Sequence, residues 1–325
     1  MNAVRRGVRF GIVVLPLPYL GARSGEDRHD ELVRMAEMAD SLGYDSVWTS
    51  DSVARSFPRF DTFCFLMALA VKTRKVKLGT LVLATPLRHP ILLARMIGTI
   101  DVFSDGRFVL GAGLGWLPEE FRNLGIPKSE RAGRTEETIL ILKELWARDQ
   151  VDFHGRYFDL RQVTVNPKPV QKPHPAILFG GESEKALRRV ARLGSGWLPG
   201  SGTTPEKICR GLECLGEIFV KEGLPAREVS TVVQLDLHLA STREIALQKG
   251  EQWYSQFQGQ IIQNKPFEMI VDGGAFGPAE ECVEKIAAYA EAGAEAMILR
   301  FFATDWLAQF ELFRERVFPA FARQG

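Results

Sequence analysis

The chain has 325 residues, of which 46% are hydrophobic and 25% are charged, and its formal net charge is +1. This composition is typical of a globular protein, and the near-neutral charge argues against nucleic acid and anionic membranes as partners. No apolar run approaches the roughly 20 residues that cross a bilayer. The four cysteines form no C-x-x-C pair, so we expect a cytoplasmic protein with reduced thiols and no signal peptide.

Strand-like apolar segments alternate with helical patterns along the chain. Strands are predicted at 8–14, 45–51, 76–84, 107–113, 176–181, 196–200, 230–240 and 295–302. Helices are predicted at 30–42 with a left-handed cap at Gly43, from about Asp61, from Pro90, and at 135–146, 183–193, 205–222, 278–291 and 305–318. Eight strand–helix units without a polar linker predict a (β/α)8 TIM barrel, with residues 1–325 as a single domain.

Three long segments interrupt this pattern, at about 113–134, 148–175 and 241–277. In a barrel of this kind the loops that follow the strands carry the active site. Segment 241–277 follows the seventh strand and contains the aromatic stretch "EQWYSQFQGQIIQ". We expect it to be either a lid that lines the substrate pocket or a helix packed on the barrel rim.

The stretch "RFVLGAGLGW" (107–116) is an apolar strand that ends in three glycines spaced two apart. A dinucleotide-binding loop needs G-x-G-x-x-G leading directly into a helix. Counted from Gly111 the last position is Trp116, and counted from Gly113 it is Pro118. The spacing therefore favours a barrel strand over a Rossmann fold that binds a nicotinamide cofactor.

A glycine pair in "ILFGGESEKALRRVARLG" ends the fifth strand at Gly180 and Gly181, and a helix follows from Ser183. Free backbone N–H groups at the start of a helix suit a phosphate, and the Ser183 hydroxyl adds a donor. The alternative is that Ser183 only caps the helix. Because this strand end lies on the active face of a barrel, we favour a phosphate site.

Four other side chains lie close to strand ends. Asp51 is expected to accept a hydrogen bond from a ligand N–H or to cap a helix. His89 is either an acid or base or a helix-cap neighbour of Pro90. Glu119 and Glu120 either reach the barrel mouth or stabilise the first turn of a short helix. The histidines form no H-x-H or H-E-x-x-H pattern, so we expect no metal site.

Several long stretches resemble the luciferase-like superfamily of flavin-dependent oxidoreductases. In chain order they are "GYDSVWTSD", "VKLGTLVLATPLRHPILLARMIGTIDVFSDGRFVLGAGLGWLPEEFRNLGIP", "FHGRYFDL", "NPKPVQKPHPAILFGG" and "ALRRVARLGSGWLP". They run from about residue 8 to 200, and "FGPAEECVEKIAAYAEAGAEAMILRF" is more weakly similar. The resemblance implies a (β/α)8 barrel that binds FMN, or its 5-deaza relative coenzyme F420, across the carboxyl ends of the strands.

The resemblance also implies where the cofactor binds. The end of the second strand and a bulge in the third would contact the ring, often through a non-prolyl cis peptide, which here matches Leu81-Val82. The glycines of the fourth strand would give the ring or the ribityl chain room, and the Gly-Gly pair matches the family's phosphate loop. The implied cofactor-binding residues are Asp51, Ser52, Leu81, Val82, Ala84, Gly113, Gly115, Gly180, Gly181 and Ser183.

The chain departs from the family after the second strand. Many relatives have Asp-His where this chain has Asp51-Ser52, so the imidazole that donates a proton or hydrogen bond is missing. The candidate catalytic residues are Ser52 as a weaker donor, His89, and Glu119 as a loop acid. A fourth alternative is chemistry that needs no side-chain acid, since a reduced flavin supplies most of its own reactivity.

We therefore expect an oxidoreductase that acts on a small organic substrate. It would use either FMN with oxygen, as a monooxygenase, or F420 by hydride transfer, and the "GWLPEEF" loop favours F420. The alternatives are a non-catalytic flavin-binding barrel and a nicotinamide-only dehydrogenase. Expected partners are the small-molecule substrate, a separate flavin reductase or F420-reducing enzyme, and a second copy of the chain in a homodimer. The sequence does not name the substrate.

Overall fold

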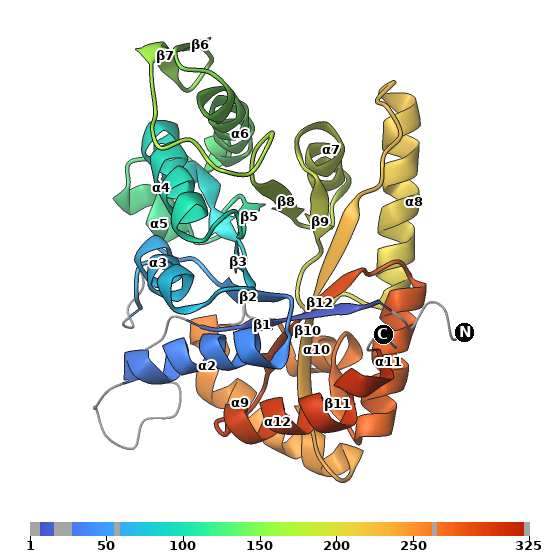
Figure 1. The fold of residues 1–325 in the computed structure, drawn as a ribbon. Helices are drawn as coiled ribbons and strands as arrows, with labels where there is room; N and C mark the ends of the chain where they lie inside the picture. The colour runs from blue at the N-terminus through green and yellow to red at the C-terminus, as the bar shows by residue number, and fades with distance from the viewer. Residues whose placement is uncertain (1–6, 16–27, 55–58, 262–264, 322–325) are drawn as a thin grey trace.

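A computed structural model describes residues 7–15, 28–54, 59–261 and 265–321. Eight parallel strands form a closed barrel, and helices surround it (Figure 1). The barrel strands are β1 (Arg9–Val13), β2 (Ser46–Thr49), β3 (Lys77–Thr80), β5 (Phe108–Gly113), β8 (Ala176–Gly180), β9 (Gly196–Leu198), β10 (Ser230–Leu239) and β12 (Ala296–Phe301). Each lies within a strand predicted from the sequence, so the predicted (β/α)8 fold is confirmed.

Strand pairing closes the ring. β1 lies between β12 and β2, and β10 closes the barrel against β9 by pairing Ser230 with Gly196. Two short strands extend it: β4 (Leu83–Ala84) continues the third strand beside β5, and β11 (Ala275–Gly277) pairs with the end of β10. Because all these strands run parallel, their carboxyl ends meet at one rim.

The helices that follow the strands begin and end at local sequence signals. They are α2 (Arg28–Leu42), α3 (Thr62–Lys72), α4 (Pro90–Phe103), α6 (Arg131–Ala147), α7 (Glu184–Leu193), α8 (Pro205–Lys221), α11 (Ala279–Glu291) and α12 (Trp306–Arg316). The Asp61 carboxylate accepts the N–H of Phe63 at 2.9 Å and so caps α3. Pro90 opens α4, and Gly43 follows α2 with φ 82°. These three predicted helix ends are confirmed.

The long segments contain regular structure, of which the sequence offered only the short helix at Glu119 and Glu120 as one alternative. Segment 113–134 contains α5 (Pro118–Asn123), the 3-10 turn η2 (Lys128–Glu130) and the first turn of α6. Segment 148–175 contains the antiparallel hairpin of β6 (Val151–His154) and β7 (Asp159–Val163), which stands off from the barrel in Figure 1. The 3-10 turns η1 (Thr85–Leu87) and η3 (Phe318–Ala320) are also unpredicted.

Segment 241–277 contains α9 (Arg243–Ile261) and α10 (Phe267–Asp272). Trp253, Tyr254 and Phe257 of α9 are buried, and the Trp253 ring lies 4.4 Å from that of Phe302 between centroids. Aromatic side chains buried against each other in this way stabilise a packed helix. Of the two interpretations of this stretch, the described residues support packing on the barrel rim.

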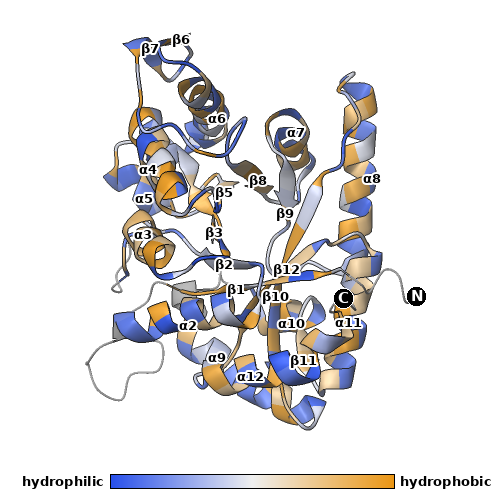
Figure 2. Cartoon of the chain, in the orientation of Figure 1, coloured by the Kyte–Doolittle hydropathy of each residue, from blue (hydrophilic) through white to orange (hydrophobic). Residues whose placement is uncertain are grey.

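Two hydrophobic cores hold the barrel together. The larger one fills the space between strands and helices, and hydrophobic and hydrophilic residues alternate along those helices (Figure 2). The inner core fills the barrel and consists of Val13, Leu15, Trp48, Val109, Leu178, Leu198, Val232, Ala296 and Ile298. Since strand residues point alternately inward and outward, the next inward positions above this inner core lie at the rim.

Candidate active site

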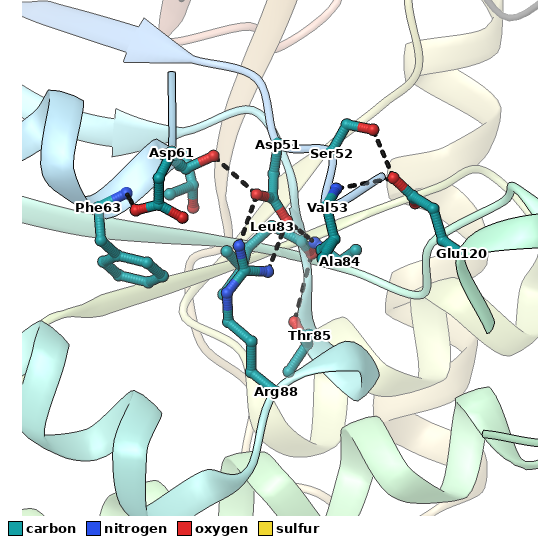
Figure 3. Close-up of polar contacts among 12 residues, drawn as sticks. Asp51, Ser52, Val53, Asp61, Phe63, Leu83, Ala84, Thr85, Arg88 and Glu120 are labelled. Atoms are coloured by element: carbon teal, nitrogen blue, oxygen red, sulfur yellow. Dashed lines mark hydrogen bonds and ion pairs between the residues drawn. The ribbon is translucent and has the colours of Figure 1, made fainter. Parts of the chain in front are cut away.

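The Asp51 carboxylate lies just beyond the end of β2 and is fully buried. Arg88 donates to its two oxygens at 2.7 and 2.8 Å, the Thr62 hydroxyl donates at 2.7 Å, and the Ala84 N–H donates at 2.9 Å (Figure 3). Burial alone would raise the pKa of Asp51. The charge of Arg88 and these hydrogen bonds outweigh burial, so the pKa lies below its ordinary value.

These contacts correct the expected role of the Asp51 side chain. Each of its oxygens already accepts two hydrogen bonds from protein groups, so the carboxylate has no free acceptor for a ligand N–H. It instead ties the end of β2 to Ala84 and Arg88, which follow β3. The side chain therefore holds the ends of β2 and β3 in place at the rim. Binding of a ligand by the backbone of Asp51 stays a prediction.

The bulge after β3 has the expected geometry, because the peptide bond between Leu81 and Val82 is cis. A Cβ placed on Gly113 would lie 2.4 Å from Cγ2 of Val82, and one placed on Gly180 would lie 3.4 Å from it. The Val82 side chain therefore lies against the ends of both β5 and β8. Contact of Leu81 and Val82 with a cofactor ring stays a prediction.

The glycines of "GAGLG" make room for protein atoms. A Cβ on Gly111 would meet the Thr80 carbonyl oxygen at 1.9 Å, and a Cβ on Gly115 would meet the Phe121 ring at 3.1 Å and Ala84 at 3.4 Å. Close contacts with protein atoms are thus enough to explain why glycines occupy these positions, without a cofactor. The strand leads into the short helix α5 within a parallel barrel, which rules out the Rossmann reading of this motif.

Ser52 and Glu120 meet at the rim. The Ser52 hydroxyl donates a hydrogen bond to Oε1 of Glu120, and this oxygen also accepts the N–H of Val53 at 2.7 Å (Figure 3). The N–H of Ala54 donates to the same oxygen at 3.1 Å. Glu120 is only 2% exposed. Of the two neighbouring acids, Glu120 and not the candidate Glu119 makes this contact, because Phe121 and Glu120 form the buried side of α5.

His89 is the N-cap of α4, and its exposed side chain accepts the N–H of Ile91 through Nδ1 at 3.4 Å. The ring packs edge-on against Phe158, with 5.6 Å between centroids. Burial lowers the pKa of His89, so it is neutral at neutral pH. The structure supports the helix-cap reading of His89 over the acid or base reading.

We expect the substitution His89→Asn to leave turnover unchanged and to raise the free energy of unfolding by a few tenths of a kcal/mol, because Asn is a good N-cap. Urea unfolding and the steady-state rate measure the two effects. A large loss of the steady-state rate with an unchanged free energy of unfolding would instead indicate that His89 acts as an acid or base.

The start of α7 is where Ser183 was expected either to cap the helix or to help bind a phosphate. The Ser183 Oγ accepts the N–H of Ala186 at 3.3 Å, so the capping role is confirmed. Before it, Gly181 has φ 114°, donates its N–H to the Leu198 carbonyl, and accepts the Trp197 indole N–H at 2.7 Å. Phosphate binding by Gly180, Gly181 and Ser183 stays a prediction.

A pocket of about 540 Å³ opens beside Ser183, and we call it the cationic pocket. Its lining residues are Leu114, Lys128, Ser129, Arg131, Ala132, Ser183, Lys185 and Arg189. Four of these are cations and none is an acid, although Arg189 is paired with Glu136 outside the lining at 2.8 Å. Sequence analysis missed this pocket, although the signal was present: basic residues recur on α7 and in the segment after β5, which the fold brings together.

A second missed group lies at the inward positions of β10 and β12. The Arg300 guanidinium donates to both oxygens of Asp236, at 2.7 and 2.9 Å, and both residues are buried. Ser201 donates to the same carboxylate at 2.6 Å, and Gln234 at 3.1 Å. Charged letters within the apolar strands "QLDLHLA" and "MILRFF" were the available signal.

Two expected absences concern the described part of the chain only. Within residues 7–15, 28–54, 59–261 and 265–321, no group of three or more His, Cys, Asp or Glu side chains is placed to hold a metal ion. Over the same ranges, no helix has the length and apolar character that crossing a membrane requires.

Comparison with known proteins identifies the relatives of this chain. An F420-dependent glucose-6-phosphate dehydrogenase of Microbacterium testaceum is 28% identical over 315 residues, which cover 89% of this chain and 93% of that protein. An FMNH2-dependent dimethylsulfone monooxygenase of Pseudomonas putida is 39% identical over 144 residues, which cover 43% of this chain and 39% of that protein. Uncharacterized mycobacterial proteins are 32% identical, and the match spans 66% of their length.

A solved structure shares the fold. The crystal structure of a monooxygenase from Streptomyces bottropensis superposes with a TM-score of 0.83 at 25% identity, covering 96% of this chain and 99% of that one. The family model of the luciferase-like monooxygenases matches residues 8–296. This match covers most of the barrel and the rim described above, and the chain therefore belongs to the luciferase-like monooxygenase family.

Proposed function

We propose that this protein is an oxidoreductase that transfers a hydride between coenzyme F420 and a small organic substrate. The observation that carries the proposal is the cationic pocket, with four cations and no acid around one cavity. A phosphate monoester such as that of FMN brings about two negative charges. F420 carries carboxylates beyond its phosphate, and a pocket with several cations suits such a tail.

The residues around the pocket fit a phosphate-bearing cofactor. Lys185 lies in the first turn of α7, two residues after Ser183, where backbone N–H groups and a positive helix end favour an anion. Lys128 and Arg131 donate to the carbonyls of Trp116 and Gly115 at 2.8 and 3.1 Å, which fixes their positions on the opposite wall. A phosphate and an acidic tail would thus meet charges from both walls.

The rim of the barrel would hold the ring system of the cofactor. Leu81 and Val82 offer an apolar surface between the ends of β5 and β8, and the Asp51–Arg88 pair keeps the neighbouring Ala84 in place. F420, when bound, accepts or gives a hydride at its C5 atom. The protein's part is to position the substrate against this atom and to handle the accompanying proton.

The second candidate function is an FMN-dependent monooxygenase. The 39% identity with the dimethylsulfone enzyme over 144 residues favours it, and so does the monooxygenase whose fold superposes. In that case a separate flavin reductase would supply FMNH2. The first function would need an F420-reducing enzyme only where the hydride passes from F420 to the substrate. Because the relatives named above are enzymes, we do not propose the non-catalytic flavin-binding barrel. We do not propose a nicotinamide-only dehydrogenase either, because the described residues form a barrel and not the Rossmann fold that this function was expected to need.

The homodimer and the cytoplasmic location remain proposals. α4 exposes a stripe of apolar side chains, among which Leu92 is 60% and Phe103 is 59% exposed. Val71 of the neighbouring α3 adds to it with 46% exposure. Apolar surface of this kind is where a second copy would be expected to bind.

We expect Lys185→Glu to weaken the binding of F420 at least about tenfold, or 1.4 kcal/mol, because the substitution reverses a charge at the pocket wall. Fluorescence titration of the purified protein at two salt concentrations measures the affinity. Lys75→Glu is the matched control, since Lys75 is also exposed but precedes β3 at the other end of the barrel. Equal affinities of the two variants would contradict the assignment of the pocket.

A further inference from the structure

The Ser52 hydroxyl has one hydrogen, and the structure shows where that hydrogen goes. It is donated to Oε1 of Glu120, while the half-buried Ser52 side chain lies at the rim beyond β2. A hydroxyl whose hydrogen is already donated can only accept a hydrogen bond from a ligand. Ser52 thus offers an acceptor at the position where the family resemblance implies an imidazole donor.

The Glu120 carboxylate behind Ser52 receives hydrogen bonds only. Oε1 accepts from Ser52, Val53 and Ala54, and two of these donors are backbone N–H groups that cannot reverse direction. Glu120 is therefore a buried acceptor toward which the hydroxyl of the half-buried Ser52 already points.

The other titratable groups singled out at this side of the rim are committed elsewhere. All four acceptor positions of the Asp51 carboxylate are filled by protein donors. His89 is exposed at the N-cap of α4, with Nδ1 bonded to the Ile91 N–H. Among the described residues singled out there, the Ser52–Glu120 pair is the route by which a proton can leave a bound substrate.

We propose that Ser52 and Glu120 form a proton relay, and that the substrate is a compound whose alcohol group is oxidised to a carbonyl. The substrate O–H donates to Ser52 Oγ, the Ser52 hydrogen passes to Glu120, and the carbon–oxygen single bond becomes double. The hydrogen on the same carbon leaves as a hydride, with two electrons, to oxidised F420. The substrate loses two hydrogens and two electrons; Glu120 gains the proton and the cofactor gains the hydride.

This proposal rests on the proposed F420 function, so its test has one arm that needs no cofactor. Infrared spectra of the cofactor-free protein at neutral pH, compared with E120Q, identify the carboxylate band of Glu120. We expect the ionised form, with a shift of this band in S52A but not in S52T, because threonine keeps the hydroxyl donor. A protonated Glu120 would overturn the relay even if F420 binds.

The second arm measures F420 reduction by 2-propanol, cyclohexanol and 1-phenylethanol in the F420-loaded protein. E120Q keeps an amide oxygen for Val53 and Ala54, so we expect kcat to fall about 100-fold or more while KM and the F420 affinity stay unchanged. S52A should show the same loss and S52T should recover most of the rate. The matched control is E119Q, the same change one residue earlier, which should behave like the wild type.

Each outcome decides between the proposals. Wild-type rates in E120Q, or hydride transfer from F420H2 to cyclohexenone without reduction of F420 by any of the three alcohols, would overturn the relay or its substrate class. A wild-type protein that binds FMNH2 but not F420 would instead contradict the proposed function. The infrared result would still report whether Glu120 is a base.

Discussion

Replacement of Asp51 by alanine is expected to lower the free energy of unfolding by about 3–5 kcal/mol. The substitution leaves the Arg88 guanidinium, whose side chain is 14% exposed, without the carboxylate that it contacts at 2.7 and 2.8 Å. It also removes the acceptor of the Thr62 hydroxyl and the Ala84 N–H. Urea unfolding of the two proteins at neutral pH measures the difference.

The same pair predicts a pH dependence. The folded-state pKa of Asp51 is lowered from its ordinary value of 3.8. A lowered pKa gives stability that is fully present above the unfolded-state pKa and is lost as pH falls through the folded-state pKa. The stability difference between wild type and Asp51→Ala should therefore be constant above about pH 5 and shrink below about pH 4.

Asp61→Ala provides the matched control for Asp51→Ala. Asp61 lies ten positions along the chain and accepts the N–H groups of Phe63 and Cys64 as a helix cap, without a buried cationic partner. Loss of a cap costs about 1 kcal/mol. If both substitutions cost the same, or if Asp51→Ala keeps its full difference below pH 4, then the buried pair with Arg88 does not stabilise the rim as described.

Gly111→Ala is expected to cost about 3 kcal/mol or more. The new Cβ would lie 1.9 Å from the Thr80 carbonyl oxygen and 3.0 Å from Leu198 Cδ1, and the carbonyl is backbone that cannot move without separating β3 from β5. The buried Thr80 hydroxyl donates to the Gly111 carbonyl at 2.9 Å and accepts its N–H at 3.0 Å, so these bonds would also be strained.

Gly216→Ala is the control, and it is expected to raise the stability that Gly111→Ala lowers. Gly216 lies inside α8, and a Cβ placed on it meets no heavy atom within 4 Å. Alanine in a helix interior is favoured over glycine by up to about 1 kcal/mol. Thermal unfolding should therefore rank Gly216→Ala at or above wild type and Gly111→Ala well below it. A tolerated Gly111→Ala would show that β3 and β5 are farther apart than described.

The barrel was predictable because its signal is periodic. Each of the eight strands is an apolar run, and caps such as Asp61, Pro90 and Gly43 act on the residues next to them. The first turn of α6 was missed because its N-terminal residues are polar and lack a capping side chain. The hairpin of β6 and β7 was missed because its strands have only four and five residues, so the alternation of Val151 and Phe153 with polar residues is too short to stand out.

The site was predictable only where the partner lies close in sequence. Ser183 caps α7 through a residue three positions away, as expected. The partner of Ser52 lies 68 positions away and that of Asp51 lies 37 positions away, so one sequence cannot choose Glu120 over Glu119 or show that Arg88 fills the Asp51 carboxylate. The pair of Asp236 and Arg300 spans 64 positions and was missed for the same reason.

The central claim, that this barrel uses F420 through the cationic pocket, is tested most directly by titrating the purified protein with F420 and with FMN, each oxidised and reduced. Cofactor absorbance and tryptophan fluorescence would follow binding in the wild type, in Lys185→Glu and in Lys75→Glu. We predict selective binding of F420 that weakens with salt and with Lys185→Glu but not with Lys75→Glu. Tight binding of FMNH2 together with no binding of F420 would contradict the claim and favour the oxygen-dependent reaction.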